Sequence, residues 1–389
     1  MQVLSIIHYP VYGGPHNRNS NVAKILRASD IRTIVLLPAE EGNAATRLRK
    51  EGIEVIQIPL QRLRSTKNII QHYTYITKFI RDIREIRTII REYNIDLVQI
   101  NGLANPQGAI AARLERVPVL WQLLDTVTPT LIRWILIPLV KRLSTVIMST
   151  GKKVAYEHLG VSPYRGELVT FYPPVDLNRF KMDKGKREKA RQELGVREDE
   201  IIIGNVSNIN PKKGHMWFIR AAALLMKKCP RARFIILGTT YETHADYAKE
   251  LWKTANELGL TLGDKLVVMQ PAERIPDLES AFDIFWMTSE PKSEGISTAV
   301  EEAMALGIPV VCTDVGSMSE IIIDGKTGYI VNPRDPEAIV DATEKLLADV
   351  ENMKNMGKNA HKMALELFSS ENCATAHMRA YKKAISEAK

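Results

Sequence analysis

Short runs of β-branched and other apolar residues alternate with helical stretches along the whole chain. In a parallel sheet each strand needs a crossover connection to the next, usually a helix, so this alternation is typical of βαβ units. The chain is therefore expected to be an α/β protein with two doubly wound domains. The expected strands are residues 3–8, 33–37, 55–58, 97–100, 119–122 and 146–149, then 201–206, 234–237, 266–269, 284–287, 310–313 and 328–331.

The chain has 389 residues, enough for two domains, and a stretch near its middle suggests where they divide. Residues 172–180 contain two consecutive prolines and precede the charge-rich residues 181–191, which makes this region the best linker candidate. We expect a first domain at residues 1–175 and a second at 176–369, with a C-terminal helix of about residues 370–389 that can pack back on the first. Ligands of such sheets bind beyond the carboxyl ends of the strands, so the expected site is the cleft between the domains.

Neither a membrane span nor a secretion signal is expected. No apolar run reaches the roughly 20 residues that a membrane-spanning helix needs. The first ten residues lack a basic region and a cleavage pattern, so we interpret them as the first buried strand. Cys229, Cys312 and Cys373 are far apart and lack metal-ligand spacing, so neither a disulfide framework nor a zinc site is indicated. These features favour a cytoplasmic location.

The segment most informative about function spans residues 291–335, where two glutamates flank a small-residue turn. Glu294 lies before the turn, and Glu302 lies inside an apolar pattern that predicts a helix over residues 299–306. The start of such a helix presents unpaired N–H groups and the positive end of the helix dipole, which suit a diphosphate. The two carboxylates can then hold hydroxyl groups on either side of the bound anion.

Other residues of this segment contribute to the same expectation. Gly295 permits a close backbone approach, and Ser297 and Thr298 can cap the helix. Glu301 and Glu302 also have a simpler interpretation, as solvated residues on an exposed helix face.

Two further turns are candidates for contact with an anion. Lys213 lies in a PKKGH turn between an expected strand and a helix that begins near His215, which makes it a plausible phosphate partner. A lysine beside a turn glycine is also commonly just solvated. Near the amino end, Gly14 belongs to a Gly-Gly turn before a helix expected from about Asn19, where the backbone can approach a ligand closely. The same turn is equally an ordinary connection between a strand and a helix.

Taken together, these segments resemble the retaining nucleotide-sugar glycosyltransferases of family 4. In chain order the likeness is carried by YGGPHN, YPPVDLNRF, NPKKGH, PAERIPDLESAFDIFWMTS, and EGISTAVEEAMALGIPVV continuing to TGYIVNPRD. The last of these is the most specific, and the resemblance covers nearly the whole chain. It implies the GT-B architecture, in which two Rossmann-like domains face each other across a cleft.

The resemblance also implies roles for individual residues. Glu294 would hold hydroxyls of the donor sugar, Glu302 would bind the ribose, and Lys213 would neutralise the β-phosphate as it becomes the leaving group. A cation and preorganised amides can lower the barrier by several kcal/mol, so no metal ion or other cofactor is expected, and the chain has no Asp-x-Asp sequence. Arg274 either flanks the base or caps a helix. The expected catalytic residues are thus Glu294 and Lys213, and the expected donor-binding residues are Gly14, Ser207, Asn208, Arg274, Gly295, Ile296, Ser297, Thr298 and Glu302.

At two positions the chain departs from the family pattern. Asn208 stands where a second phosphate-binding arginine is usual, and asparagine adds no charge. Leu124 stands where a histidine is usual near the reacting sugar carbon. His16, Gln122 or Asp125 is expected to substitute for it on the acceptor side. We therefore expect donor or acceptor selection to differ from that of other members.

Positive charge is concentrated in the first part of the chain. Residues 1–180 hold 24 Lys and Arg against 14 Asp and Glu, whereas residues 181–389 hold 29 against 31. Residues 66–93 form an expected amphipathic helix with an arginine stripe, and residues 131–143 combine apolar and basic side chains. Both suit an anionic membrane surface, although the apolar stripes can instead pack on the sheet. The members of the first stripe are Ile69, Tyr73, Ile76, Ile80, Ile83 and Ile90, with Arg81, Arg84, Arg87 and Arg91 beside them.

The function predicted from the sequence is transfer of a sugar from a nucleoside-diphosphate sugar, with a UDP-sugar favoured, to a glycan or lipid-linked acceptor. The setting would be surface polysaccharide or glycolipid assembly at the inner face of the membrane, with no nucleic-acid partner. A phosphorylase or sugar-nucleotide epimerase would keep the same fold. A non-catalytic module that binds anions or membranes is the alternative of a different class.

Overall fold

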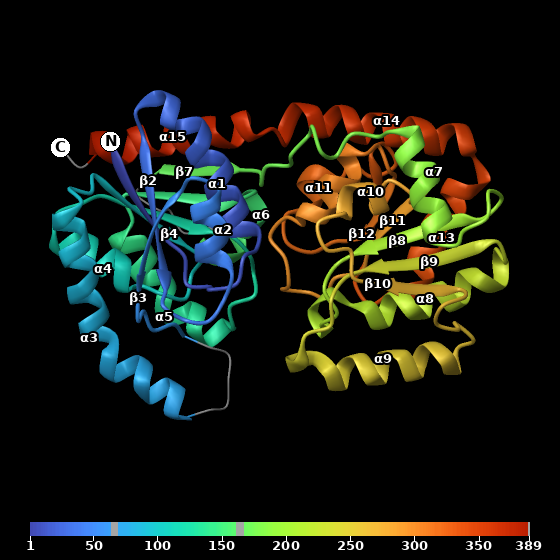
Figure 1. Ribbon diagram of the computed structural model, residues 1–389, viewed down its shortest axis with the longest axis horizontal. Helices are drawn as coiled ribbons and strands as arrows, with labels where there is room; N and C mark the ends of the chain where they lie inside the picture. Colours follow the sequence, from blue (N-terminus) through green and yellow to red (C-terminus); the bar gives the residue numbers. More distant parts are fainter. Residues whose placement is uncertain (64–68, 161–166, 388–389) are drawn as a thin grey trace. The chain divides into compact units, whose positions relative to one another are not determined.

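The computed structural model describes residues 1–63, 69–160 and 167–387, and the chain divides into two compact units (Figure 1). Unit 1 consists of Met1–Pro174 together with Ser370–Lys389, and unit 2 consists of Val175–Ser369. Each unit has its own parallel sheet and hydrophobic core. The prediction of an α/β protein with two doubly wound sheets is therefore confirmed.

Within the described residues, the sheet of unit 1 has seven parallel strands in the order β3-β2-β1-β4-β5-β6-β7. Leu4 on β1 lies opposite Ile34 of β2 and Val98 of β4. Both faces are covered, which is why the central strands are nearly continuous apolar runs in the sequence. The strands are β1 (Gln2–Ile6), β2 (Arg32–Pro38), β3 (Glu54–Ile58), β4 (Leu97–Asn101), β5 (Val119–Leu123), β6 (Val146–Thr150) and β7 (Glu167–Phe171).

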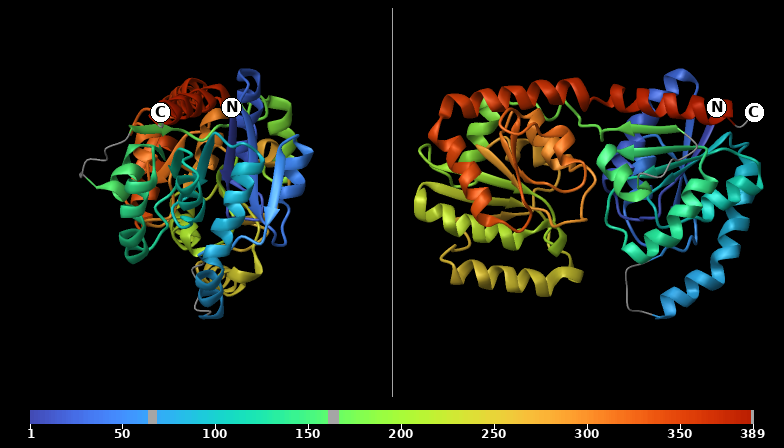
Figure 2. Two further views of the ribbon diagram at one scale, coloured as in Figure 1. Left: turned by 90° about the vertical axis from the view of Figure 1, so that its left-hand side faces the viewer. Right: turned by 180° about the vertical axis from the view of Figure 1, so that it is seen from behind.

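Helices cover both faces of this sheet (Figures 1 and 2). Helices α3 to α6 share one core with Leu4 and Ile100 of the sheet. Helices α1, α2 and α15 pack on the other face, and α15 lies against α1. The helices of unit 1 are α1 (Gly14–Leu26), α2 (Ala44–Lys50), α3 (Ile69–Glu92), α4 (Gln107–Leu114), α5 (Thr130–Leu143), α6 (Lys152–Leu159) and α15 (Ser370–Glu387).

Unit 2 has a six-stranded parallel sheet in the order β10-β9-β8-β11-β12-β13. Its core contains a cluster of large aromatic rings, in which Phe218 packs edge-on against Trp286 with ring centroids 5.4 Å apart. The strands are β8 (Ile201–Val206), β9 (Ala232–Leu237), β10 (Leu266–Met269), β11 (Ile284–Met287), β12 (Val310–Thr313) and β13 (Gly328–Val331). The helices are α7 (Lys184–Glu193), α8 (His215–Lys228), α9 (Ala245–Glu257), α10 (Ile275–Glu279), α11 (Thr298–Ala305), α12 (Met318–Ile321), α13 (Pro336–Ala348) and α14 (Val350–Leu367).

The strand order reverses beside the first strand of each unit. In unit 1 the reversal lies between β1 and β4, and in unit 2 it lies between β8 and β11. Open α/β sheets bind their ligands beyond the carboxyl ends of the strands at this switch point. The loops that follow β8 and β11 are therefore the places to look for function in unit 2, and the loop after β1 is the corresponding place in unit 1.

Two local expectations from the sequence are wrong. The first helix begins at Gly14 and not near Asn19, because Pro15 fits the first helical turn and His16 caps it. The charged end of the expected linker is in fact α7, which is anchored by ion pairs from Arg187 and Arg191 to Asp283.

Helix α3 is buried in its second half and exposed in its first. Ile86 and Ile90 are in the core, whereas Tyr73, Ile76 and Ile80 are 68%, 71% and 61% exposed. Figure 2 shows this first part extending past the sheet of unit 1. Residues 66–68 of the expected helix, and the Ile69 side chain, lie outside the described residues. Within the described part of the chain, no helix is long and apolar enough to cross a membrane.

Candidate functional site

Two loops beyond the carboxyl ends of β8 and β11 bring Lys213 and Glu294 together. Lys213 Nζ lies 2.7 Å from Glu294 Oε1, and Ser289 Oγ donates a hydrogen bond to the same oxygen at 2.8 Å. Glu294 is only 7% exposed, whereas the side chain of Lys213 is 30% exposed. The two residues expected to be catalytic therefore form an ion pair at the switch point of unit 2, in which the glutamate is buried and the lysine is partly exposed.

The position of Lys213 is fixed by the turn that carries it. Pro211–Lys213 form a 3-10 turn, which begins at Asn210 with a side-chain cap. Gly214 then adopts a left-handed φ of 66° and leads into α8. A Cβ at Gly214 would lie 1.8 Å from the carbonyl oxygen of Thr288. Glycine is therefore required here both for its φ and for close packing against the end of β11.

The loop after β11 enters α11 at Thr298. Ser297 is the N-cap residue, but its side chain makes no capping hydrogen bond, so the capping role expected for Ser297 is wrong. Ile296 is buried. The carbonyl oxygen of Gly295 accepts a hydrogen bond from Ser317 N at 2.8 Å. The N–H of Ser297 lies 3.5 Å from Met318 Sδ. A helix start without a side-chain cap nevertheless keeps the positive end of the helix dipole, an arrangement that suits an anion.

Two buried glutamates of unit 2, Glu279 and Glu301, lie within the influence of the charge of a third, Glu302. Glu279 and Glu301 are fully buried, and their carboxyl oxygens have no hydrogen-bond partner among the described residues. Glu302 is half-buried, and burial raises its pKa to about 8 against the opposing charge of Arg179. The interpretation of Glu301 as a solvated surface residue is therefore wrong.

Ser207 and Asn208 follow β8 but make different contacts. Ser207 Oγ donates to Asn205 Oδ1 at 2.6 Å and lies 3.0 Å from His215 Nε2. His215 is fully buried, and this burial lowers its pKa to about 4, so the ring is neutral. Asn208 is exposed, and its Oδ1 accepts from the backbone N–H of Thr239 at 3.2 Å.

Arg274 precedes α10 and makes a bidentate ion pair with Glu193 of α7, at 2.8 and 2.6 Å. Its side chain does not cap α10. The pair lines a surface groove of roughly 330 Å³ together with Lys186, Lys189 and Asp277. The capping interpretation of Arg274 is thus wrong, and contact with a nucleobase would require the guanidinium to leave Glu193.

In unit 1, the Gly13–Gly14 turn starts α1 just beyond β1. A Cβ at either position would meet no atom within 4 Å. Neither glycine has a positive φ. Packing and backbone conformation in unit 1 therefore do not require glycine here, which fits a stretch of backbone that a ligand approaches closely.

Two of the three residues expected on the acceptor side make hydrogen bonds within unit 1. Both ring nitrogens of His16 are engaged, Nδ1 by the N–H of Gly13 at 3.1 Å and Nε2 by the carbonyl oxygen of Tyr9 at 2.9 Å. Gln122 is fully buried, where it accepts from Arg18 at 2.7 Å and pairs with His377 Nε2 at 2.9 Å. The polar atoms of both side chains are thus engaged inside unit 1.

The third acceptor-side residue, Asp125, is half-buried beyond β5. Its Oδ1 accepts from the N–H of Val127 at 3.0 Å, and its backbone carbonyl accepts from His158 at 2.6 Å. Burial raises the pKa of Tyr9, on the loop after β1, and the charge of Asp125 raises it further. Leu124, beside it, packs against the core under α1 and α15.

His8 is a candidate that sequence reasoning missed. It follows β1, is 1% exposed, and neither ring nitrogen has a partner among the described residues. Burial, and secondarily the charge of Arg62, lowers its pKa to about 3, so the ring is neutral. Gln107 lies at the start of α4, which follows β4, the strand next to β1. Its Oε1 is also buried and has no partner among the described residues. The sequence signal that could have identified His8 is its position just beyond the end of the first strand.

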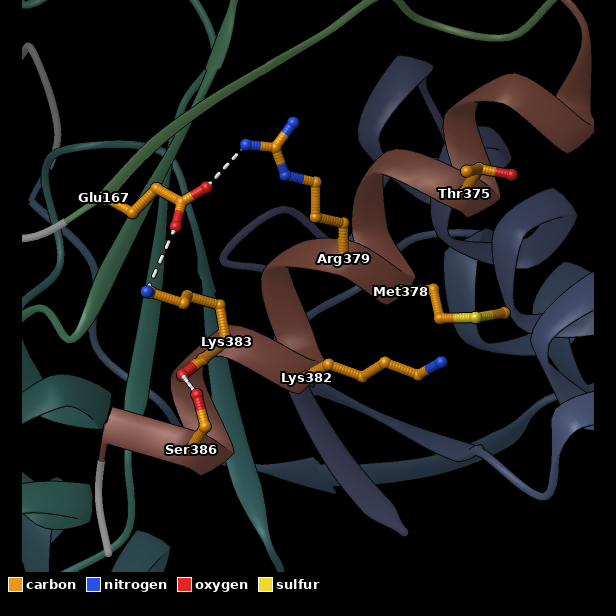
Figure 3. Close-up of a pocket in the computed structure, with 7 residues that line it drawn as sticks. All are labelled: Glu167, Thr375, Met378, Arg379, Lys382, Lys383 and Ser386. Atoms are coloured by element: carbon orange, nitrogen blue, oxygen red, sulfur yellow. Dashed lines mark hydrogen bonds and ion pairs between the residues drawn. The ribbon is translucent and has the colours of Figure 1, made fainter.

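A surface groove of unit 1 lies elsewhere. It has a volume of roughly 690 Å³ and is formed by α15 and the start of β7 (Figure 3). There Glu167 pairs with Arg379 at 2.7 Å and Lys383 at 3.6 Å, and these cations lower the pKa of Glu167. None of the expected site residues lines this groove. Within the described residues, no group of acidic, histidine or cysteine side chains has a metal-binding arrangement.

Comparison with protein families gives one match in each unit. Residues 13–168 match the glycosyl transferase 4-like domain, and residues 186–363 match the glycosyl transferases group 1. The chain belongs to the group 1, family 4-like glycosyltransferases. The family resemblance drawn from its sequence motifs is thereby confirmed.

Curated relatives of this glycosyltransferase act on different substrates. The D-inositol 3-phosphate glycosyltransferase of Corynebacterium urealyticum is 28% identical over 247 residues, which cover 63% of this chain and 58% of the relative. The GDP-mannose-dependent alpha-(1-6)-phosphatidylinositol monomannoside mannosyltransferase of Mycolicibacterium smegmatis is 30% identical over 221 residues, 56% of this chain and 53% of the relative. The chain thus spans about half the length of the curated relatives it matches.

Solved structures resemble this glycosyltransferase over nearly its full length. HepE of Anabaena, in complex with UDP-glucose, has a TM-score of 0.81 at 23% identity and covers 99% of this chain and 100% of its own. A glycosyltransferase from Rickettsia africae has the same TM-score at 20% identity, covering 99% of this chain and 98% of its own. At these identities the likeness shows the fold, which is the expected GT-B fold of two Rossmann-like units.

Proposed function

We propose that this chain is a retaining, metal-independent glycosyltransferase that moves a sugar from a nucleoside-diphosphate sugar to a hydroxyl group of its acceptor. The observation that carries the proposal is the pairing of Lys213 with Glu294 beside the uncapped start of α11. A cation, a carboxylate and a helix N-terminus meet at the switch point of a doubly wound sheet, where such sheets bind nucleotides. Membership of the glycosyltransferase family supports the same function.

The proposed reaction breaks the bond between the sugar's anomeric carbon and the diphosphate. The acceptor oxygen forms the new bond, and the proton of its hydroxyl passes to an oxygen of the departing diphosphate. Negative charge grows on the diphosphate as it leaves. We expect Lys213 and the first amides of α11 to stabilise that charge. Glu294 accepts hydrogen bonds from the sugar hydroxyls, and Glu302 accepts them from the ribose. When the donor binds, Lys213 exchanges Glu294 for phosphate, which leaves Glu294 free for the sugar.

We propose a UDP-sugar as the donor. HepE, which shares the fold, was solved with UDP-glucose, whereas the Mycolicibacterium smegmatis relative is named for GDP-mannose. A thermal-shift screen of the full chain with UDP, GDP and ADP tests this choice. A nucleotide at 100 times its dissociation constant stabilises the protein by about 2.7 kcal/mol, so UDP should raise the melting temperature more than the others do.

Two results of this screen would count against the proposal. A larger shift with GDP would replace the UDP-sugar by a GDP-sugar, and no shift with any nucleotide would contradict nucleotide-sugar use altogether. Product analysis with a glycan acceptor then separates transfer from the other reactions of this fold. Transfer gives a glycosylated acceptor with retained anomeric configuration, whereas phosphorolysis or epimerisation leaves the acceptor unchanged.

For the acceptor we propose a lipid-linked molecule reached from a membrane surface. Helix α5 exposes Leu131, Trp134 and Ile135 by 74%, 78% and 63%, and basic Arg142 is exposed on the same helix. Large apolar side chains grouped with basic ones on one helix suit the interface of an anionic bilayer. The exposed first half of α3 adds further apolar surface in the same unit.

Most arginines of the stripe expected to face the membrane form ion pairs within unit 1. Arg87 and Arg91 both pair with Glu115, and Arg81 pairs with Asp82. Most of the membrane affinity must therefore come from the apolar side chains. The Trp134→Ala variant should lose at least half of its co-sedimentation with phosphatidylglycerol vesicles while keeping its melting temperature. Equal binding of the variant and the wild type, or no preference over neutral vesicles, would reject the membrane role.

A further inference from the structure

The loop between β1 and α1 is anchored to α2 along one side. The N–H of Tyr12 donates to Asn43 Oδ1 at 2.8 Å, and its phenol donates to Glu51 Oε1 at 3.1 Å. The N–H of Ala44 donates to the carbonyl oxygen of Pro10 at 2.9 Å. Because these contacts involve both ends of α2, the path of the loop is fixed on this side.

His16 anchors the same loop from inside α1. Its Nδ1 lies 3.1 Å from the backbone nitrogen of Gly13, and its Nε2 lies 2.9 Å from the carbonyl oxygen of Tyr9. A backbone N–H only donates and a carbonyl oxygen only accepts, so Nδ1 carries the lone pair and Nε2 carries the hydrogen. The ring is 1% exposed, and burial lowers its pKa, which favours this neutral form. One side chain therefore joins two points of the loop that are four residues apart.

The Gly13–Gly14 turn is thus fixed on one side and open on the other. The ring of His16 stacks on that of Tyr12, with centroids 5.6 Å apart, so the two sets of anchoring contacts meet. On the open side, a Cβ at Gly13 or Gly14 would meet no atom of the described residues within 4 Å. Such a stretch of backbone needs little further ordering when a ligand binds against it.

We propose that His16 is a positioning residue that holds the backbone of Gly13 and Gly14 in place to receive the diphosphate of the nucleotide-sugar. The inference rests on the proposed function and on the expectation that Gly14 belongs to the donor-binding residues. Both ring nitrogens stay on the loop, so His16 acts through the turn and not on the ligand itself. Each residue that the ligand would otherwise have to order weakens its binding by roughly tenfold.

A different role for His16 is to cap α1. It is the third residue of the helix, the position at which a capping-box side chain accepts from the N–H of the N-cap residue. Capping explains the contact with Gly13 but not the contact with Tyr9. The two roles also differ in their consequences. A lost cap destabilises unit 1 whatever ligand is used, whereas a displaced turn weakens only those ligands that reach it.

Titration calorimetry of the full chain with UDP and with UMP tests the inference. UMP lacks the β-phosphate, which makes it the control ligand for contact between the turn and the diphosphate. His16→Leu should bind UDP about 10- to 100-fold more weakly than the wild type and UMP equally well. His16→Gln keeps one acceptor and one donor on its amide, so it should restore most of the UDP affinity. Tyr381→Phe removes a buried hydrogen bond of unit 1 outside the turn and should leave both affinities unchanged.

The outcomes separate this inference from the proposed function. If His16→Leu loses affinity for UDP and UMP equally, or for neither, the inference is overturned while the proposed function stands. A loss in His16→Gln as large as that in His16→Leu would also count against it. If the wild type binds no nucleotide, the proposed function fails and the inference fails with it.

A ligand-free measurement tests the geometry without depending on a folded variant. Nitrogen-15 labelling of histidine distinguishes protonated from unprotonated ring nitrogens, and His16→Gln identifies the signals of His16. At pH 7, Nε2 should carry the hydrogen and Nδ1 should carry none. A hydrogen on Nδ1 would exclude the hydrogen bond from Gly13 and would overturn the inference even where UDP binds normally.

Discussion

At the scale of single residues, the proposed site consists of charges that the fold holds in unusual surroundings. Lys213 and Glu294 form an ion pair, whereas the carboxyl oxygens of Glu301 have no hydrogen-bond partner among the residues that the structure describes. The ion pair stabilises the fold and holds the Lys213 ammonium group where a phosphate is proposed to bind. The burial of Glu301 costs stability, and proteins tolerate such costs mainly where function requires them.

Lys213→Ala should reduce kcat by roughly 10²- to 10³-fold, because removing one preorganised group that stabilises transition-state charge typically has an effect of this size. Lys212→Ala is the matched control, since Lys212 lies in the same turn with an exposed side chain. Steady-state kinetics with the donor identified by the thermal-shift screen provide the measurement. Equal losses in the two variants would argue for a general effect of positive charge in the turn and against the specific role of Lys213.

Glu301→Gln should stabilise the protein at pH 8 and leave its stability unchanged at pH 4. The pKa of Glu301 is raised above its ordinary value of 4.5, so the unfolded chain releases this proton before the folded chain does. The wild type therefore loses up to about 1.4 kcal/mol per pH unit from this residue between its unfolded and folded pKa values. Urea unfolding at both pH values measures the difference, with the exposed Glu188→Gln as control. Destabilisation of Glu301→Gln at pH 8 would contradict the assignment.

At the scale of secondary structure elements, glycines at the starts of two helices serve opposite purposes. Gly214 before α8 is fixed by its left-handed φ and by the nearby carbonyl of Thr288. Gly14 in α1 has open space around it and an ordinary conformation. The local fold therefore dictates glycine at one helix start but not at the other.

Gly14→Ala and Gly214→Ala should consequently separate activity from stability. Gly14→Ala should keep or slightly raise stability, by up to about 1 kcal/mol, because alanine restricts the unfolded chain. It should lose activity if the proposed ligand approaches this backbone. Gly214→Ala should unfold more readily by at least 1 kcal/mol, because its Cβ would strain the turn. Denaturant midpoints and donor turnover measure both effects, and a fully active Gly14→Ala would remove Gly14 from the proposed site.

The elements themselves were largely predictable from the sequence, because strands buried on both faces are recognisable as apolar runs. Strand β7 was missed, since Glu167–Phe171 is short and alternates between exposed and buried positions. The Lys213–Glu294 pair was predictable in residue identity through the family motifs. The structural roles of His16 and Gln122 were not, because their partners Tyr9, Arg18 and His377 come together only in the folded unit.

At the scale of the whole molecule, α15 connects the end of the described chain to the core of unit 1. Tyr381 OH donates to Gln99 on β4 at 2.6 Å, and His377 contacts Gln122 on β5. Arg18 lies in the same buried network, over the ring of Phe171. Buried polar networks of this kind favour one arrangement of their elements, because another arrangement leaves more buried groups unsatisfied.

Tyr381→Phe should therefore destabilise unit 1 in particular. Loss of a hydrogen bond to buried Gln99 should cost about 1–3 kcal/mol, whereas Tyr156→Phe at an exposed site should cost little. Hydrogen exchange should show faster exchange in α1, β1 and β4 and unchanged exchange in β8 and β11. Uniform acceleration in both units would show that the network stabilises the chain as a whole and not unit 1 alone.

The return of α15 to unit 1 has a consequence for the order of events during synthesis. Unit 2 is one continuous segment, whereas unit 1 needs residues 370–389, which leave the ribosome only after unit 2 is complete. Domains usually fold in the order in which they emerge. Here unit 2 can complete its folding before unit 1 does. Until α15 is available, the apolar face of unit 1 that it covers stays exposed. We expect chaperones that act on nascent chains to bind that face.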